Sequence, residues 1–432
     1  MTPELKGFLF LSVIKMLAVF TVIMVGVALL TLMERKVSAW MQNRRGPNRV
    51  GWAGLLQPAA DGVKNILKEE TYPALANRWL FLLAPAMSFV PALLLSGVIP
   101  FAAPIPIDFD VTVGFSFFGL FPVDLGRWVH HGLMPMVVAD LPIGFLFVLA
   151  ISSMGVYGVA LAGWSSNSKY ALLGGLRASA QMVSYEVAMG LSLIPVLLLS
   201  GNVSFSAIIA DQQAGLWYVL PLFLSFFIFL VSGFAETNRL PFDLPEAESE
   251  LIAGYHTEYS AMKFSFFFIA EYANVVTVCA MVTTLFFGGW SIPFVAVGPD
   301  HPGALLTLAP GLLATLLTGL AFFLKLMFWI FFIMWIRWTL PRFRYDQLMA
   351  LGWKVLMPLA LAYIMVVCTA IYVLEHRLGV AGPKQEALAL FGINLVLMVL
   401  VFGVLDSGVF IRGSGRQRAT LEARAERATV TS

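Results

Sequence analysis

Carboxylates gather in one short stretch of an otherwise apolar chain. Residues 235–250 read AETNRLPFDLPEAESE, with a single basic residue, Arg239. The acidic members are Glu236, Asp243, Glu246, Glu248 and Glu250. Clustered carboxylates raise one another's pKa, and partial burial raises it further, so such a group can bind or release protons near neutral pH. Two prolines and interleaved apolar residues are unusual for a solvated connection, so we expect a role in proton handling or docking.

Other charged side chains lie within or beside long apolar runs, where each is costly unless it is paired or hydrated. Glu186 lies in SYEVAMG and Glu271 in FFFIAEYANV, while Asp140 is near the end of a run and Lys325 is inside another. Together with Glu236, they are candidate members of a buried proton path. For each residue taken alone, an ion pair or hydrogen bond that only locks two helices is an equal alternative. Several such residues beside an acidic loop favour the path.

A basic segment near the N-terminus is the second polar feature. ERKVSAWMQNRRGPNR, at 34–49, carries Arg and Lys side chains around a turn that Gly46 and Pro47 bend. Apolar residues then recur at helical spacing from 52 to 67, which predicts an amphipathic helix on the membrane surface. The segment is either an anchor that touches lipid headgroups, or the mouth of a site where an amphiphile passes from lipid to a soluble partner.

Motifs for a redox centre, a metal or a nucleotide are missing from the sequence. Cys279 and Cys368 lie in apolar runs without a second Cys or His at ligand spacing, so neither an iron–sulfur cluster nor a zinc site is expected. There is no phosphate-binding loop and no dinucleotide glycine fingerprint. The residues alone indicate a proton- or quinone-handling membrane module that lacks a redox centre of its own.

The composition defines the elements that must position these groups. Of 432 residues, 59% are hydrophobic and only 12% are charged, with a mean hydropathy of +0.85, which excludes a large soluble domain. The net charge of +2 gives no reason to expect nucleic acid as a partner. We therefore expect an all-α polytopic bundle. Its nine predicted spans lie near 8–33, 79–100, 141–163, 180–200, 217–236, 264–287, 314–336, 355–374 and 388–408.

The positions of Lys and Arg predict how the chain is threaded, because basic loops stay on the cytoplasmic side. With the N-terminus outside, 21 of the 27 basic residues fall in inner segments and four in outer ones. The inner segments are 34–78, 164–179, 237–263, 337–354 and 409–432. An odd number of spans returns the Arg-rich tail to the inside, as this rule requires.

Three long motifs resemble the H-subunit family of proton-translocating NADH:quinone oxidoreductase, respiratory complex I. They are ERKVSAWMQNRRGPNRVGWAGLLQPAADGVKNILKEE, AETNRLPFDLPEAESELIAGYHTEYSAMKFSFFFIAEYANV and IRWTLPRFRYDQLMALGWK, at 34–70, 235–275 and 336–354. The resemblance covers residues 8–374. Members of that family have eight spans, so we expect residues 1–387 to form this core. Residues 388–432 would add a further span and a basic cytoplasmic tail, which suggests a bacterial chain in the plasma membrane.

The resemblance implies a membrane subunit at the junction with the hydrophilic arm, with no catalytic residue of its own. Its partners would be the other membrane subunits and the peripheral subunits that hold the iron–sulfur clusters and flavin, and quinone would be its substrate. Positions matching the quinone chamber are Glu34, Arg35, Arg45 and Asp61. Positions matching the acidic loop are Glu236, Asp243, Glu246, Glu248 and Glu250. Glu186 and Glu271 match carboxylates that lead toward the membrane proton channels.

Three alternatives stay open at the level of sequence. The nearest is the equivalent subunit of a membrane-bound hydrogenase, in which the same scaffold meets a different electron-accepting arm; the long RRGPNR and PFDLPEAESE segments favour the quinone enzyme. A stand-alone secondary transporter would predict an internal repeat and broken helices, and neither is evident. A purely structural anchor for the peripheral arm predicts that neutral substitutions of the buried carboxylates leave turnover unchanged.

Overall fold

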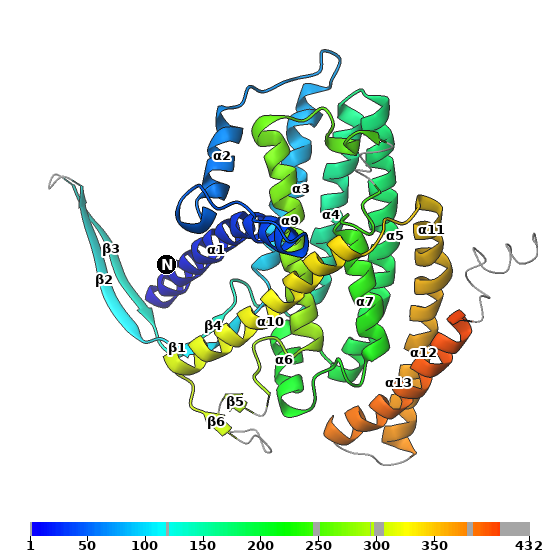
Figure 1. Ribbon diagram of the computed structural model, residues 1–432. Helices are drawn as coiled ribbons and strands as arrows, with labels where there is room; N and C mark the ends of the chain where they lie inside the picture. Colours follow the sequence, from blue (N-terminus) through cyan, green and yellow to red (C-terminus); the bar gives the residue numbers. More distant parts are fainter. Residues whose placement is uncertain are drawn as a thin grey trace, which may run out of the picture.

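A bundle of long apolar helices makes up most of the molecule, as the composition predicts (Figure 1). The computed structural model describes residues 2–117, 121–244, 251–293, 295–297, 306–377 and 383–406. In this part of the chain, eight helices are long and apolar enough to cross a membrane. The protein is therefore a multi-pass membrane protein.

The helices follow the predicted spans with shifted ends. They are α1 (Pro3–Met41), α2 (Gln57–Leu67), α3 (Arg78–Ser96), α4 (Gly144–Ser165), α5 (Lys169–Ser200), α6 (Phe205–Ala214), α7 (Phe223–Glu236), α9 (Ala261–Phe286), α10 (Leu312–Thr339), α11 (Tyr345–Ala350), α12 (Met357–His376) and α13 (Pro383–Asp406). A π-helical segment, Leu351–Leu356, joins α11 to α12. Single 3-10 turns occupy Trp52–Gly54 and Gly254–His256. The surface helix expected after the first span is α2, none of whose residues is buried.

The fifth predicted span is shorter in the structure than its apolar run suggests. Residues 217–236 are expected to cross, but α7 begins only at Phe223 and has 14 residues. At 1.5 Å per residue it is about 21 Å long, less than the roughly 30 Å of a hydrocarbon core. Turns occupy 218–222, where Pro221 lacks an N–H for helix propagation. The N-terminal end of α7 therefore depends on neighbouring elements for its hydrogen bonds.

Small residues let the central helices approach closely. A Cβ added at Gly158 of α4 would come within 2.7 Å of the Ser88 backbone nitrogen in α3, and one at Gly163 within 3.1 Å of the Gly175 Cα in α5. Close backbone approach of this kind drives helix association in lipid, where the hydrophobic effect between helices is weak. The helices α3, α4 and α5 are consequently packed as a compact row.

Contacts between loops divide the molecule into two sides. Asn77 donates its backbone N–H to Ser165 (3.2 Å) and Phe343 donates to Pro241 (3.2 Å), so the loops predicted as inner lie together. We call this the basic side. On the other side, Ala103 N–H donates to the Thr318 hydroxyl (3.1 Å).

A β-hairpin, which is absent from the predicted spans, marks that opposite side. Strands β2 (Phe109–Phe117) and β3 (Phe121–His130) pair antiparallel and project away from the helices (Figure 1). We call this the hairpin side. Strands β1 (Ala102–Pro106) and β4 (Leu133–Met136) also pair antiparallel, and β5 (Val295–Val297) and β6 (Leu306–Leu308) pair parallel. The alternating residues of FDVTVGFSF are typical of a strand.

Candidate functional site

Glu34 is the centre of a buried ion network near the basic side. It lies near the C-terminal end of α1, where only 5% of the residue is exposed. Its carboxylate accepts hydrogen bonds from Arg239 Nη1 (3.2 Å), from the Tyr272 hydroxyl (2.7 Å) and from Arg337. A buried carboxylate is tolerated only when it is paired and hydrogen-bonded, and three partners satisfy Glu34.

Arg239 joins Glu34 to a second carboxylate. Its Nε donates to Glu271 Oε1 at 2.6 Å, and its guanidinium lies over the Tyr272 ring, 3.9 Å from the centroid. Only 2% of Arg239 is exposed. Burial opposes its charge, but Glu271 and Glu34 outweigh burial and raise the pKa of Arg239 above its ordinary value. Arg239 is therefore a fixed cation held between two carboxylates.

Asp243 lies in the loop after α7 and forms a separate pair. Arg342 Nη2 donates to its Oδ2 at 3.1 Å, whereas Oδ1 is buried without a hydrogen-bond partner among the described residues. Burial raises the pKa of Asp243 to about 6, against the opposing effect of Arg342. Asp243 is thus the acidic-loop carboxylate outside the spans that the structure describes, and burial brings its pKa closer to neutral pH.

A small cavity adjoins Glu236 at the end of α7. Its volume is about 20 Å³, and its polar lining comes from Ser152 of α4, Glu236, and Asn274 and Thr277 of α9. Glu236 Oε2 is buried there with no hydrogen-bond partner in the described part of the chain. A cavity of roughly 10–15 Å³ suffices for one water molecule when polar partners are present. The space beside Glu236 thus has the size and polarity to hold a water.

Glu186 of α5 completes this group. Its carboxyl is close enough to that of Glu236 for their charges to repel, and Ser152 contacts both. Two carboxyl groups that contact the same hydroxyl, one of them beside a water-sized cavity, can exchange a proton, because a single charge on the pair is favoured over two.

One face of α9 joins the ion network to this cavity. Glu271, Asn274 and Thr277 follow one another at intervals of three residues, so each side chain is a neighbour of the next on the helix surface. Glu271 contacts Arg239, and the other two line the Glu236 cavity. The arrangement is a polar stripe that runs from the ion network to the Glu236–Glu186 pair.

The other predicted chamber residues lie at the surface of the basic side. Arg35 Nη1 pairs with Asp61 Oδ2 of α2 at 2.6 Å, and Gln57 donates to the same carboxylate at 3.0 Å. The Arg35 side chain is about half exposed. Arg45 is exposed in the loop between α1 and α2. The Arg35–Asp61 pair holds α2 against α1 beside the buried network.

The structure thus brings together Glu34, Glu271, Glu236 and Glu186, which are predicted site residues from separate places in the sequence. Asp140 lies apart on the hairpin side, where it accepts hydrogen bonds from Ser204 and Ser206. The predicted loop residues Glu246, Glu248 and Glu250 lie outside the described residues.

Several members of the site were not predicted as site residues: Arg239, Arg337, Tyr272, Asn274, Ser152 and Thr277. Asn274 and Tyr272 could have been found from the motif AEYANVVT, since Asn274 is three residues after Glu271 and Tyr272 directly follows it. The pairing of Arg337 with Glu34 spans 303 residues of sequence, and no local pattern indicates it. Among the described residues, no group of three or more His, Cys, Asp or Glu is placed to hold a metal ion.

The chain is similar to one family of known proteins over most of its length. Residues 14–368 match the family model described as NADH dehydrogenase. The NADH-quinone oxidoreductase H subunit, copy 2, of Koribacter versatilis is 50% identical over 370 residues, which cover 85% of this chain and 98% of that protein. The second H subunit of Geobacter metallireducens is 49% identical (82% and 93% covered), and the H subunit of Leptospira biflexa is 46% identical (82% and 92%).

Proposed function

Because the chain belongs to the H-subunit family of NADH-quinone oxidoreductase, we propose that it lines a quinone chamber and couples quinone reduction to proton movement. The polar stripe of α9 is the observation that carries this proposal. It links a buried ion network near the basic side with a pair of carboxylates and a water-sized cavity inside the bundle. A purely structural anchor would not need buried carboxylates at both ends of this polar stripe.

The proposed chamber opens at the basic side, between α1 and α2. Glu34, Arg35, Arg45 and Asp61 would line it, with apolar side chains of α2 exposed toward lipid at its entrance, among them Val63, Ile66 and Leu67. An amphiphilic quinone fits an entrance that is apolar outside and charged within. Flavin and iron–sulfur clusters would be held by partner subunits of the peripheral arm.

The coupling step follows from charge balance in the ion network. Reduction of a quinone takes up two electrons and two protons, so the quinone carries negative charge beside Glu34 from the arrival of the electrons until both protons have bound. Any such charge alters the balance among Glu34, Arg239 and Glu271, because buried charges interact strongly at low dielectric. A proton that moves to or from Glu271 would then change the electrostatic potential at Glu236 and Glu186, at the other end of the polar stripe. Glu246, Glu248 and Glu250 would extend this carboxylate set in the acidic loop.

We place the protein in a bacterial plasma membrane, with the basic side cytoplasmic. Residues 1–387 would form the family core, and residues 388–432 would form an added span and tail. The partners would be the other membrane subunits and the peripheral quinone-site and iron–sulfur subunits.

Glu271→Gln and Glu186→Gln in the assembled enzyme test the coupling role. Each variant removes a titratable group but keeps its shape, so NADH oxidation with an artificial acceptor should stay normal. Quinone-dependent proton pumping should fall at least several-fold. Asp346→Asn is the matched control, because Asp346 lies on the basic side in an exposed pair with Arg344. Unchanged pumping in both variants would contradict the coupling role and favour a structural anchor.

Arg35→Ala tests the chamber separately. Loss of the Arg35–Asp61 pair should raise the quinone concentration needed for half-maximal activity, with little change in artificial-acceptor activity. An unchanged response to quinone would remove Arg35 from the chamber. Identification of co-purifying peripheral subunits distinguishes the quinone enzyme from a related membrane-bound hydrogenase.

A further inference from the structure

A cage of backbone carbonyls surrounds the ammonium group of Lys325 on the hairpin side. Lys325 Nζ donates to the carbonyl oxygens of Phe287 (2.7 Å), Gly289 (2.9 Å) and Ser291 (2.6 Å). All three belong to the loop that follows α9, whereas Lys325 lies in the middle of α10. The indole ring of Trp217 covers the group, with its centroid 4.3 Å from Nζ.

The loop is folded so that alternate carbonyls converge. Gly288 and Gly289 both have positive φ, +69° and +54°, a conformation that glycine adopts without strain. A Cβ at Gly288 would lie 2.2 Å from Ser291 Oγ and 2.7 Å from Trp217 Nε1. The N–H groups of Gly288 and Gly289 donate away from Lys325, to Gln212 Oε1 (3.0 Å) and the Thr283 carbonyl (2.8 Å). The backbone therefore presents its oxygens to one point.

This geometry suits a monovalent cation. An ammonium group has three N–H donors, and here three carbonyls accept them while an aromatic face supplies a cation–π contact. Lys325 lies outside the ion network and the polar stripe that the proposed function uses. The cage is thus a cation site that the chain fills with its own side chain.

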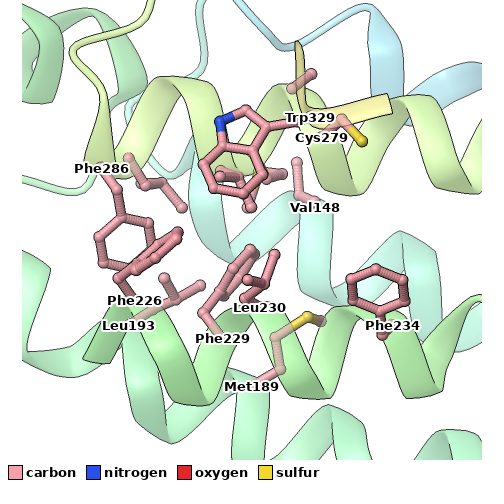
Figure 2. Close-up of a cluster of buried hydrophobic side chains, with 14 of the residues drawn as sticks. Val148, Met189, Leu193, Phe226, Phe229, Leu230, Phe234, Cys279, Phe286 and Trp329 are labelled. Carbon is pink, nitrogen blue, oxygen red and sulfur yellow. The ribbon is translucent and has the colours of Figure 1, made fainter. Parts of the chain in front are cut away.

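An apolar cluster lies between the cage and the cavity at Glu236. Phe287 of the cage packs on Phe226 and Trp329, with ring centroids 5.7 and 5.2 Å apart. Phe226 and Phe229 both contact Phe286, and Phe229 also lines the cavity. Figure 2 shows Phe226, Phe229, Phe286 and Trp329 gathered with Met189, Leu193 and Leu230. Apart from the buried thiol of Cys279, the labelled side chains include no titratable group.

We propose that Lys325 and its carbonyl cage seal the hairpin side of this protein against proton leakage. The apolar cluster excludes water, and the ammonium charge held by the three carbonyls repels any cation that enters with water. Removal of the ammonium would remove this repulsion. It would also leave three carbonyls without a donor within the membrane, where they draw in water. Loss of the charge and loss of the hydrogen bonds would thus both increase proton leakage.

The test uses the whole complex in liposomes without NADH, so it is independent of the proposed coupling. A potassium diffusion potential drives protons, and a trapped pH dye reports the passive leak. Lys325→Met and Lys325→Gln should raise the leak on the order of tenfold, the change expected when a unit charge that acts over roughly 10 Å at an effective dielectric of about 20 is removed. Lys325→Arg, which keeps the charge, should leak like the wild type. If the methionine variant fails to assemble, the glutamine variant, which keeps two donors, carries the test.

Lys15→Met is the matched control. Lys15 is also a buried lysine on the hairpin side, bound to the carbonyls of Pro135 (3.3 Å) and Val137 (2.8 Å). It lies in α1, outside the cage and the apolar cluster, so its loss should not change the leak. A wild-type leak in the neutral Lys325 variants would overturn the proposal. So would an equal leak in Lys15→Met, or an arginine variant as leaky as the methionine variant.

Discussion

At the scale of residues, the ion network is balanced charge for charge. Glu34 and Glu271 face Arg239 and Arg337, two carboxylates and two guanidinium groups that pair within the bundle. Removal of one partner from such a set leaves a buried charge uncompensated, which typically costs about 3–5 kcal/mol. The same sensitivity suits the network to respond to a proton or electron arriving beside it.

Asp243 should make stability depend on pH. Its pKa is about 6 in the folded protein and 3.8 as the ordinary value, so between these values the folded state holds a proton that the unfolded state has lost. The free energy of unfolding should therefore fall as pH rises from about 4 to about 6, by up to about 3 kcal/mol. Thermal unfolding midpoints of the complex at pH 4.5, 5.5 and 7 measure this fall.

The Asp243→Asn variant cannot titrate and should lack this part of the pH dependence. Relative to it, the wild type should be most stable at pH 4.5 and lose that advantage by pH 7. Asp346→Asn, which removes an exposed carboxylate, should parallel the wild type. Parallel curves for wild type and Asp243→Asn would show that Asp243 does not titrate in this range.

At the scale of elements, α13 compensates for the shortness of α7. Asn394 of α13 is 3% exposed; it donates to the Pro221 carbonyl at the start of α7 and to the Leu390 carbonyl, and accepts from the Tyr363 hydroxyl at 2.7 Å. A carbonyl at membrane depth needs such a partner. Helix α13 thus helps to satisfy the hydrogen bonds of the short span that carries Glu236.

Asn394→Leu should weaken the docking of α13. The change leaves the Pro221 carbonyl and the Tyr363 hydroxyl without this partner, at a cost of about 1–3 kcal/mol for each buried group. We expect a lower thermal midpoint and faster proteolysis between α12 and α13. Leu388→Ala, on an exposed position of α13, is the control and should change neither. Wild-type behaviour of the leucine variant would mean that apolar packing alone holds α13.

At the scale of the whole molecule, the two sides differ in how their charged side chains are paired. The basic side carries the ion pairs Arg35–Asp61 and Arg342–Asp243, whereas on the hairpin side Lys15 and Lys325 bind backbone carbonyls. The contacts assign the loops to two sides, and the basic residues predict that the basic side is cytoplasmic.

Labelling of single cysteines tests this orientation. In a Cys368→Ala background, where the remaining native Cys279 is buried, Asp108→Cys on the hairpin side should react with a membrane-impermeant maleimide added outside intact cells. Asn48→Cys on the basic side should react only after the membrane is opened. Both positions are exposed, so a difference in labelling reports the side of the membrane. The reverse pattern would invert the predicted topology.

Membrane insertion, the helical class and the surface helix α2 could be predicted from the sequence, because each depends on local patterns of apolar residues. The length of α7 and the β2–β3 hairpin were missed. Residues 217–236 are apolar enough to span, but turns at Pro221 shorten the helix. A count of apolar residues does not detect the alternation in FDVTVGFSF, which indicates a strand.

The sequence by itself determined which residues are charged in an apolar chain and that lipid makes each of them costly. Only the tertiary structure decided how that cost is met. Arg239 lies between Glu34 and Glu271, Glu236 meets Glu186 beside a cavity, and Lys325 enters a carbonyl cage. The reason is physical: a buried charge is stabilised by partners within a few ångströms in space, and helix packing brings those partners together from distant parts of the chain.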